Sequence, residues 1–217
     1  MTAIPSSPRP ARRRLILVGA ALPWLPRASR AADAGRLPTP AQIEGPFHPV
    51  RPAPDTDGDL VLVRGRDARA TGEVLHVRGR VTDLQGRPVR DALVELWQAD
   101  ARGIYDHPAA PDTARRDPGF QGHGTVRTDA QGRYAFRTIR PGRYPGRTPH
   151  LHFKVEAAGL RPLVTQMYFA GEPGNERDFL LGRLGEHERR ALVVPFAEAP
   201  GIETGGRLGN FDIVLAG

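Results

Sequence analysis

Cysteine is absent from the 217 residues of this chain, and its absence excludes several kinds of chemistry. Without thiols the protein cannot form disulfides, bind zinc or an iron–sulfur cluster through sulfur, or use a cysteine nucleophile. Any metal ion must therefore be bound by histidine, tyrosine, aspartate or glutamate.

Acidic residues are missing from the first 32 positions, so the formal net charge of +7 is unevenly distributed. Six arginines lie in this segment: Arg9, Arg12, Arg13, Arg14, Arg27 and Arg30. Of the 31 basic residues 25 then remain, against 24 acidic ones, so the rest of the chain carries only +1. This balance gives no support for nucleic acid binding. The length suffices for one domain with its own core.

Long apolar runs are also lacking. After Arg12-Arg13-Arg14 comes a run of roughly 11 apolar residues, too short to span a bilayer stably, and then an alanine-rich segment. Arg12-Arg13 with Leu15-Ile16 resembles a twin-arginine signal, which directs export of folded proteins, and an ordinary arginine-rich export signal is the alternative. We expect residues 1–32 to be a cleaved signal and the protein to be exported, to the periplasm.

The remaining chain divides into two parts. Residues 33–72 are rich in proline, glycine and aspartate, which predicts an extended N-terminal arm with one short strand at Leu60–Val63. From residue 73 onward, short runs of β-forming residues are separated by turn signals. The expected strands are Val74–Val81, Ala92–Trp97, Gly124–Thr128, Arg133–Thr138, His150–Glu156, Leu163–Phe169 and Phe211–Leu215.

Turns and helices complete this prediction. Asp83–Gly86 and Asp129–Gly132 are near-identical turns, in which aspartate can accept bonds from its own backbone and glycine supplies a positive φ. Only Asp178–Leu192 has a helix-like pattern. We therefore expect an all-β fold, in which residues 73–217 form a single antiparallel β-sandwich with long functional loops and one short helix.

Two segments carry candidate functional residues. Tyr105 lies in a loop after the strand that ends at Trp97, and Tyr144 and Arg147 precede the strand His150–Phe153. His150 and His152 are two residues apart on this strand, so their imidazoles project from one face. Such a pair is more often a polar sheet face than a metal site, but the neighbouring Tyr144 and Arg147 favour a metal. Two phenolates with two imidazoles favour ferric iron over zinc or copper.

These residues lie within segments that resemble the signature of the intradiol ring-cleavage dioxygenases. The first runs from Val77 to Tyr105 with the pattern V-x-G-x-V-x4-G-x2-V-x4-V-E-L-x6-G-x-Y. It continues in Arg140–Pro145, His150–Phe153, Leu163–Phe169 and Phe211–Leu215. The resemblance covers about residues 44–215 and is greatest to the iron-bearing β chains of protocatechuate 3,4-dioxygenases. Part of the first segment also occurs in transthyretin-like modules without catalytic activity, which lack the ordered tyrosines and histidines.

The resemblance implies a function for each matching residue. One ferric ion per chain, with no organic cofactor, would be bound by Tyr105, Tyr144, His150 and His152. Tyr144 matches the tyrosine that leaves the metal when substrate binds, and its phenolate can accept a catechol proton. Arg147 matches an arginine beside the bound ring and Gln166 a glutamine of the pocket. The expected reaction joins both atoms of O2 to a catechol and yields a cis,cis-muconate-type diacid.

Several alternatives stay open at this point. The loop between Tyr144 and His150 is shorter than in the protocatechuate enzymes, where it holds two arginines, and Arg147 can replace either. Protocatechuate, catechol, hydroxyquinol and lignin-derived catechols are all candidate substrates. The chain can act as a homo-oligomer or with a related α chain. An exported binding module without iron is the rival function, but only 2 Trp and 4 Tyr are available for an aromatic binding face.

Overall fold

The computed structural model of this protein describes residues 36–50 and 55–217, and the predicted export signal lies outside them. Within these ranges the chain forms two five-stranded sheets, three short 3-10 helices and one α-helix. None of the helices found there is long and apolar enough to cross a membrane.

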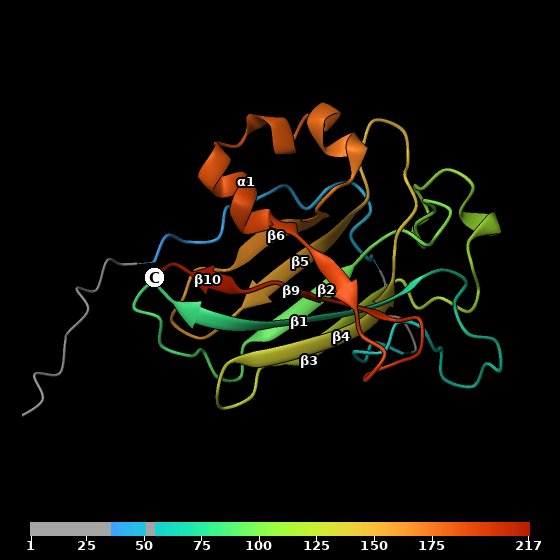
Figure 1. Cartoon of the computed structure of the whole chain (residues 1–217). Helices are drawn as coiled ribbons and strands as arrows, with labels where there is room; N and C mark the ends of the chain where they lie inside the picture. Colours follow the sequence, from blue (N-terminus) through green and yellow to red (C-terminus); the bar gives the residue numbers. More distant parts are fainter. Residues whose placement is uncertain (1–35, 51–54) are drawn as a thin grey trace, which may run out of the picture. The chain divides into compact units, whose positions relative to one another are not determined.

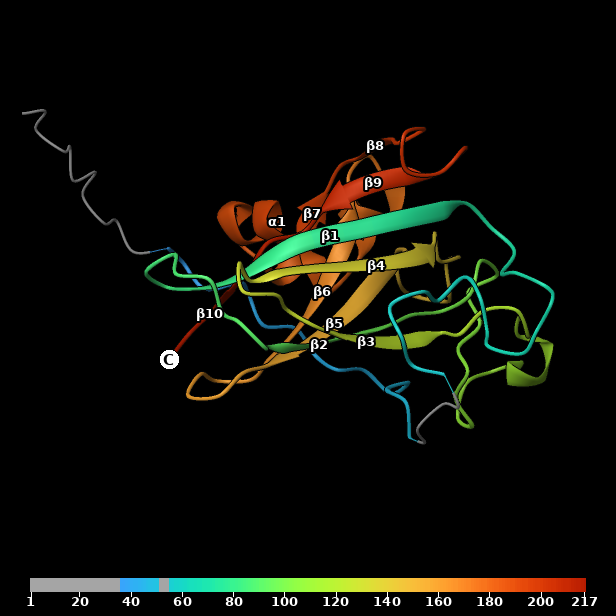
Figure 2. The ribbon, with the colours of Figure 1, turned by 90° about the horizontal axis from the view of Figure 1, so that it is seen from below.

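The first sheet is built around β1 (Val74–Asp83), as Figures 1 and 2 show. On one side β1 pairs antiparallel with β4 (Arg133–Ile139). On its other side it pairs in parallel with β9 (Arg207–Asn210) and then with β10 (Ile213–Leu215). An outer strand, β8 (Phe196–Glu198), pairs antiparallel with β9.

The second sheet carries the predicted histidine pair. Its order is β3 (His123–Arg127), β2 (Leu93–Trp97), β5 (His150–Glu156), β6 (Leu163–Phe169) and β7 (Val193–Val194). The first four strands pair antiparallel, whereas β7 runs parallel to β6.

One hydrophobic cluster contains side chains from both sheets. Tyr134 and Phe136 of β4 contact Phe153 of β5 edge-on, each with ring centroids 6.2 Å apart. Phe211, which precedes β10, also packs on Phe153 at 5.1 Å. Edge-on contacts between aromatic rings are favourable in addition to the area that they bury. Because Leu151 and Phe153 face this core, His150 and His152 must project from the opposite face of β5.

The prediction of a purely antiparallel fold was wrong, since β7, β9 and β10 each have a parallel neighbour. Alternation of side chains predicts a strand but not its direction, and parallel pairing depends on a crossover that returns the chain to the same end. Between β6 and β7 this crossover contains η2 (Pro173–Arg177), η3 (Leu181–Arg183) and α1 (Glu186–Leu192), which lies beside β6 and β7 (Figure 1).

The helix predicted over Asp178–Leu192 is therefore only half α-helical. The α-helix α1 begins after Gly185, whose N–H donates to the Glu188 carboxylate at 2.8 Å. Upstream, the Asp178 carboxylate accepts the backbone N–H groups of Leu180 and Leu181, each at 3.1 Å. Bonds of this kind satisfy the backbone of a turn and compete with a continuous helix.

The other predicted strands form within a few residues of their expected ends, except at Leu60–Val63. This segment forms no strand, and a single bridge to Arg137 comes from Asp59, the residue before it, although Leu60 and Val61 are fully buried. The Leu60 N–H donates to the Arg137 carbonyl at 2.8 Å. Leu60 and Val61 thus enter the core from a loop. A short run of apolar residues looks the same in the sequence whether it forms a strand or a buried loop.

Both aspartate-glycine turns form as predicted. In the first, Asp83 Oδ1 accepts the N–H groups of Gln85 at 3.0 Å and Arg87 at 2.9 Å. Asp129 makes the same two bonds in the second turn, each at 2.9 Å. The glycines of the two turns have φ values of 76° and 72°. The strand registers place both turns at the end of the sheets opposite to the start of β5.

Candidate active site

The polar atoms of the four predicted ligand side chains lie together in one cluster. His150 Nε2 and His152 Nε2 are 3.1 Å apart, and His152 Nε2 is 3.1 Å from Tyr105 Oη. Tyr144 Oη lies 3.4 Å from His150 Nε2. Among the described residues, no group of three histidine, aspartate or glutamate side chains could hold a metal ion. The tyrosine oxygens are therefore needed to complete a metal site here.

The two imidazoles are held rigidly at the start of β5. His152 lies opposite Trp97 of β2, and their rings stack with centroids 4.8 Å apart and planes 12° from parallel. Both histidines are almost completely buried. Burial, assisted by the nearby Arg147 charge, lowers the pKa of His150 to about 3 and that of His152 well below its ordinary value. Both rings are thus neutral, which is the state that binds metals.

The orientation of His150 is set by the backbone. Its Nδ1 lies 2.6 Å from the carbonyl oxygen of Thr148. A carbonyl can only accept, so Nδ1 carries the hydrogen and Nε2 directs a lone pair at the cluster. Metal-binding histidines are commonly oriented by such a bond.

Tyr105 is placed by a loop that folds around Asp100. One carboxylate oxygen of Asp100 accepts the N–H groups of Arg102 at 2.8 Å and Ile104 at 3.0 Å, and the other accepts that of Asp117 at 2.8 Å. Tyr105 is only 4% exposed. Its burial, and secondarily the neighbouring phenol, raise the pKa of Tyr105 well above the ordinary value of 10.0. It therefore stays a neutral phenol unless a cation lies beside its oxygen.

Two glycines let the loops that carry Tyr105 and Tyr144 approach closely. Gly103 has a φ of 82°, and a Cβ there would lie 2.2 Å from the Arg143 carbonyl oxygen. A Cβ on Gly142 would lie 2.5 Å from the Ala101 oxygen. This close backbone contact brings the two tyrosine rings to a centroid distance of 5.6 Å.

Replacing Gly103 by alanine is therefore expected to destabilise the protein by about 2 kcal/mol or more, since it adds both a positive-φ strain and a backbone clash. Urea unfolding would measure this change. Gly182→Ala is the matched control, because a Cβ there meets nothing within 4 Å and its φ is ordinary. We expect the control to change stability by no more than about 0.5 kcal/mol. Equal stability of the two variants would contradict the close packing of the loops.

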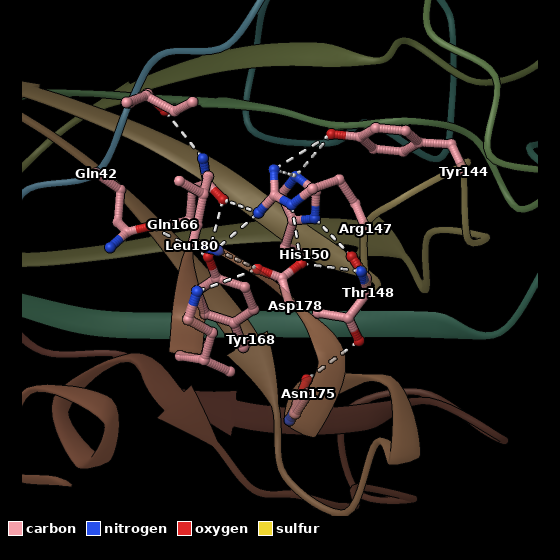
Figure 3. A network of polar contacts seen from close by, with 12 residues as sticks. Gln42, Tyr144, Arg147, Thr148, His150, Gln166, Tyr168, Asn175, Asp178 and Leu180 are labelled. Carbon is pink, nitrogen blue, oxygen red and sulfur yellow. Dashed lines mark hydrogen bonds and ion pairs between the residues drawn. The ribbon is translucent and has the colours of Figure 1, made fainter. Parts of the chain in front are cut away.

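Arg147 lies beside the cluster and is held by three side chains (Figure 3). Its Nε donates to Asp178 Oδ2 at 2.8 Å, and its Nη2 donates to Gln166 Oε1 at 2.6 Å and to Tyr168 Oη at 3.2 Å. Burial opposes both charges, but the bond between them raises the pKa of Arg147 and lowers that of Asp178. A permanent ion pair thus fixes the guanidinium.

The remaining guanidinium nitrogen, Arg147 Nη1, faces the donor cluster. It lies 3.4 Å from both Tyr144 Oη and His150 Nε2. Burial raises the pKa of Tyr144, while the Arg147 charge acts in the opposite direction. The arginine thus favours negative charge on this phenol oxygen.

Two of the residues around Arg147 have roles that the sequence did not reveal. Gln166, predicted to line the pocket, is fully buried, and its amide nitrogen donates to the Ile43 carbonyl at 2.9 Å. This bond fixes the amide whose oxygen accepts from Arg147. Asp178, the first residue of the segment with a helix-like pattern, is the buried partner of Arg147. The only sequence signal for Asp178 was an acidic residue at the start of the helix-like pattern.

The N-terminal arm contributes a wall of the site, which sequence reasoning missed. The Phe47 ring lies 4.9 Å from Tyr105 and 6.2 Å from Tyr144. His48 packs edge-on against Trp97, and its Nε2 bonds Glu95 at 3.0 Å. The available signal was a large aromatic residue within a segment rich in glycine and proline.

Two cavities adjoin the cluster. One of about 430 Å³ is lined by Phe47, Tyr105 and His107 among others, and one of about 360 Å³ by Tyr144, Arg147 and others. Each tyrosine therefore borders a different cavity. Small molecules can approach the cluster from either of these sides.

Comparison with known proteins places this arrangement in a family. The sequence profile described as Dioxygenase matches residues 43–217. A protocatechuate 3,4-dioxygenase beta chain from Burkholderia cepacia is 41% identical over 194 residues, covering 83% of this chain and 82% of that protein. The chain therefore belongs to the intradiol ring-cleavage dioxygenase family.

Relatives with other substrates in their names are similar as well. Catechol 1,2-dioxygenase 2 of Acinetobacter lwoffii is 36% identical over 65% of this chain, and hydroxyquinol 1,2-dioxygenase of Rhodococcus opacus is 35% identical over 82%. The matches span 54% and 64% of those two proteins.

Solved structures agree with this assignment. The dioxygenase domain of a carbohydrate-binding fusion protein from Streptomyces sp. SirexAA-E has a TM-score of 0.64 at 37% identity, with 82% of this chain and 98% of that one covered. Catechol 1,2-dioxygenase from Acinetobacter sp. ADP1 has a TM-score of 0.64 at 28% identity, with 82% and 62% covered.

Proposed function

We propose that this chain is a non-haem Fe(III) dioxygenase that cleaves a catechol ring between its two hydroxylated carbons and yields a cis,cis-muconate-type diacid. The observation that carries this proposal is the clustering of two imidazole nitrogens and two phenol oxygens, with the lone pair of His150 Nε2 directed inward by Thr148. A protocatechuate-like substrate is supported by the similarity to the beta chain, which extends over most of both proteins.

The donor set fits a ferric ion. Phenolate is a hard anionic donor, and a site with two tyrosines and two histidines suits a hard trivalent cation. Burial raises the pKa of Tyr105, so its phenol would ionise only with a cation beside its oxygen, and a bound ferric ion would supply that cation. Tyr105, Tyr144, His150 and His152 would hold the ferric ion, which would supply Lewis acidity toward a catechol.

The two tyrosines have different roles in this proposal. Tyr105 is buried and held by a tightly bonded loop, so it stays in place. Tyr144 is partly exposed and borders a cavity, so it can move away when a catechol binds. Its phenolate oxygen can then accept a proton from the catechol, which makes it a built-in base.

Arg147 supplies a fixed positive charge beside the reacting ring. Its side chain is only 7% exposed, and the guanidinium cannot turn away because Asp178 binds its Nε and Gln166 binds its Nη2. A preorganised cation in a dry site stabilises negative charge that develops on the substrate.

Iron content, colour and product formation test the proposal on the chain expressed by itself, without a related α chain. We expect about one iron per chain, an absorption band in the visible range from tyrosinate bound to ferric iron, and O2 uptake with at least one member of a panel of catechols. Tyr105→Phe should remove the band, and Tyr134→Phe should keep it, because Tyr134 donates to the Phe211 carbonyl in the core. A colourless protein that stays inactive after ferric reconstitution would favour an exported binding module instead.

A further inference from the structure

A hollow of about 740 Å³ lies at the other end of the sheets, near the two aspartate-glycine turns. It is larger than either cavity beside the tyrosines. Five arginines line it: Arg36, Arg78, Arg80, Arg127 and Arg133. Only two carboxylates, Asp129 and Asp212, lie among the lining residues. The lining residues thus carry a net charge of +3, of which Asp91, the ion-pair partner of Arg127, offsets one, on a body that carries only +1.

Three of these arginines are brought together by the sheet itself. Arg78 and Arg80 are two residues apart on β1 and so project from the same face. Arg80 lies directly opposite Arg133 of β4 in the antiparallel register. Like charges in directly opposed positions of a sheet destabilise it. Asp129 offsets the charge of Arg133, so the charges that remain for an anion on these two strands are those of Arg78 and Arg80.

The acidic side chains nearby do not neutralise this group fully. Arg133 pairs with Asp129 at 2.7 Å, and Arg127 pairs with Asp91 at 3.4 Å, so two of the five arginines have a carboxylate partner. Within the described part of the chain, the guanidinium groups of Arg36, Arg78 and Arg80 form no ion pair with a carboxylate within 4.0 Å. Asp212, the other acid of the hollow, accepts the backbone N–H of Arg80 at 2.9 Å.

An arginine at the opposite end of the same sheet has carboxylate partners. Arg137 of β4 pairs with Asp59 at 3.0 Å and with Glu203 at 2.7 Å. This fold can therefore place carboxylates against arginines on this sheet. Their scarcity around Arg78 and Arg80 is specific to the hollow.

A further polar group in the hollow also lacks a partner. Thr82 lies two residues after Arg80, lines the hollow and is 3% exposed. Its hydroxyl makes no hydrogen bond to the described residues. Buried polar groups without partners are rare and mark places where a bound molecule or water completes the structure.

We propose that this hollow binds a small multivalent oxyanion, a molecule with two or more carboxylate or phosphate groups. Guanidinium groups form paired hydrogen bonds with both kinds of oxyanion. Several arginines around one concave surface suit a ligand that carries several negative charges. The site is separate from the histidine–tyrosine cluster, so its occupation does not depend on iron.

Titration calorimetry on the iron-loaded protein tests this proposal with two probes, propane-1,2,3-tricarboxylate and fructose 1,6-bisphosphate, and with acetate as the monovalent control. We expect at least one probe to bind, acetate to bind no more than weakly, and affinity to fall as NaCl is raised. The probe that binds more tightly identifies the oxyanion. Absence of binding by both probes would overturn the proposal, as would binding of heparin alone, which would indicate a polymer surface.

The variant R78A/R80A should weaken binding at least about tenfold, because each lost charge-assisted hydrogen bond is worth roughly that factor. R66A/R161A is the matched control, since Arg66 and Arg161 are exposed, lie outside the hollow and change the net charge equally. The control should stay within about twofold of the unmodified protein. Equal weakening in both variants would show a general charge effect and refute the site. Ring cleavage by R78A/R80A should be unchanged, which separates this result from failure of the proposed catalytic function.

Discussion

Replacing His152 by alanine is expected to abolish iron binding and to lower ring cleavage by at least about a thousandfold. His152 is the central member of the donor cluster, because its Nε2 lies 3.1 Å from both His150 Nε2 and Tyr105 Oη. Its loss leaves three donors and opens a space above Trp97, on which its ring stacks. Metal analysis of the purified protein and O2 uptake would measure both effects.

His107→Ala provides the control for this experiment. His107 is also buried, at 7% exposure, and lines the cavity beside Tyr105, but it makes no hydrogen bond to the four donors. We expect this variant to keep its iron. Loss of iron from both variants would point to disturbed packing, which near-ultraviolet circular dichroism would detect. Full iron content in His152→Ala would show that the ligand assignment is wrong.

Replacing Arg147 by lysine is expected to lower kcat by about a hundredfold while iron content stays unchanged. Lysine keeps the charge, but a single ammonium group cannot bind Asp178 and Gln166 and also face Tyr144 as the three guanidinium nitrogens do. The variant therefore keeps the positive charge but no longer holds it in one position. Steady-state kinetics with the best catechol of the panel, together with iron analysis, would measure the change.

Asp178→Asn separates positioning from charge in the same experiment. This variant keeps Arg147 but replaces the charged partner of its Nε by a neutral one, so the arginine is held less firmly. We expect a smaller fall in kcat, of about tenfold, because the guanidinium still bonds Gln166 and Tyr168. An unchanged kcat in Arg147→Lys would mean that a precisely placed guanidinium is not required.

The donor residues could be found in the sequence because two of them follow from local geometry. His150 and His152 alternate with core residues on a strand, and this alternation alone places both imidazoles on one face. The tyrosines could be singled out only by their neighbourhood and by the resemblance to a family. That their oxygens meet the imidazoles within 3.4 Å depends on two loops whose approach is permitted by Gly103 and Gly142.

Other parts of the site have no local signature. Asp178 reads as a helix-start residue and Phe47 as part of a polar arm, yet one fixes Arg147 and the other packs on Tyr105. Their positions result from the crossover after β6 and from the path of the arm. Contacts between residues so far apart in the chain leave no periodic pattern in the sequence.

Side-chain chemistry and short-range periodicity in the sequence predict seven of the strands, the two tight turns, the absence of sulfur ligands and the histidine pair. The strands β7, β8 and β9 were not predicted, and the tyrosines could be assigned only through the resemblance to a family. Tertiary packing sets the direction of β7, β9 and β10, the partners of Arg147 and the gathering of five arginines in one hollow. These features arise when distant segments pack against each other, and the packing energy belongs to the pair rather than to either segment.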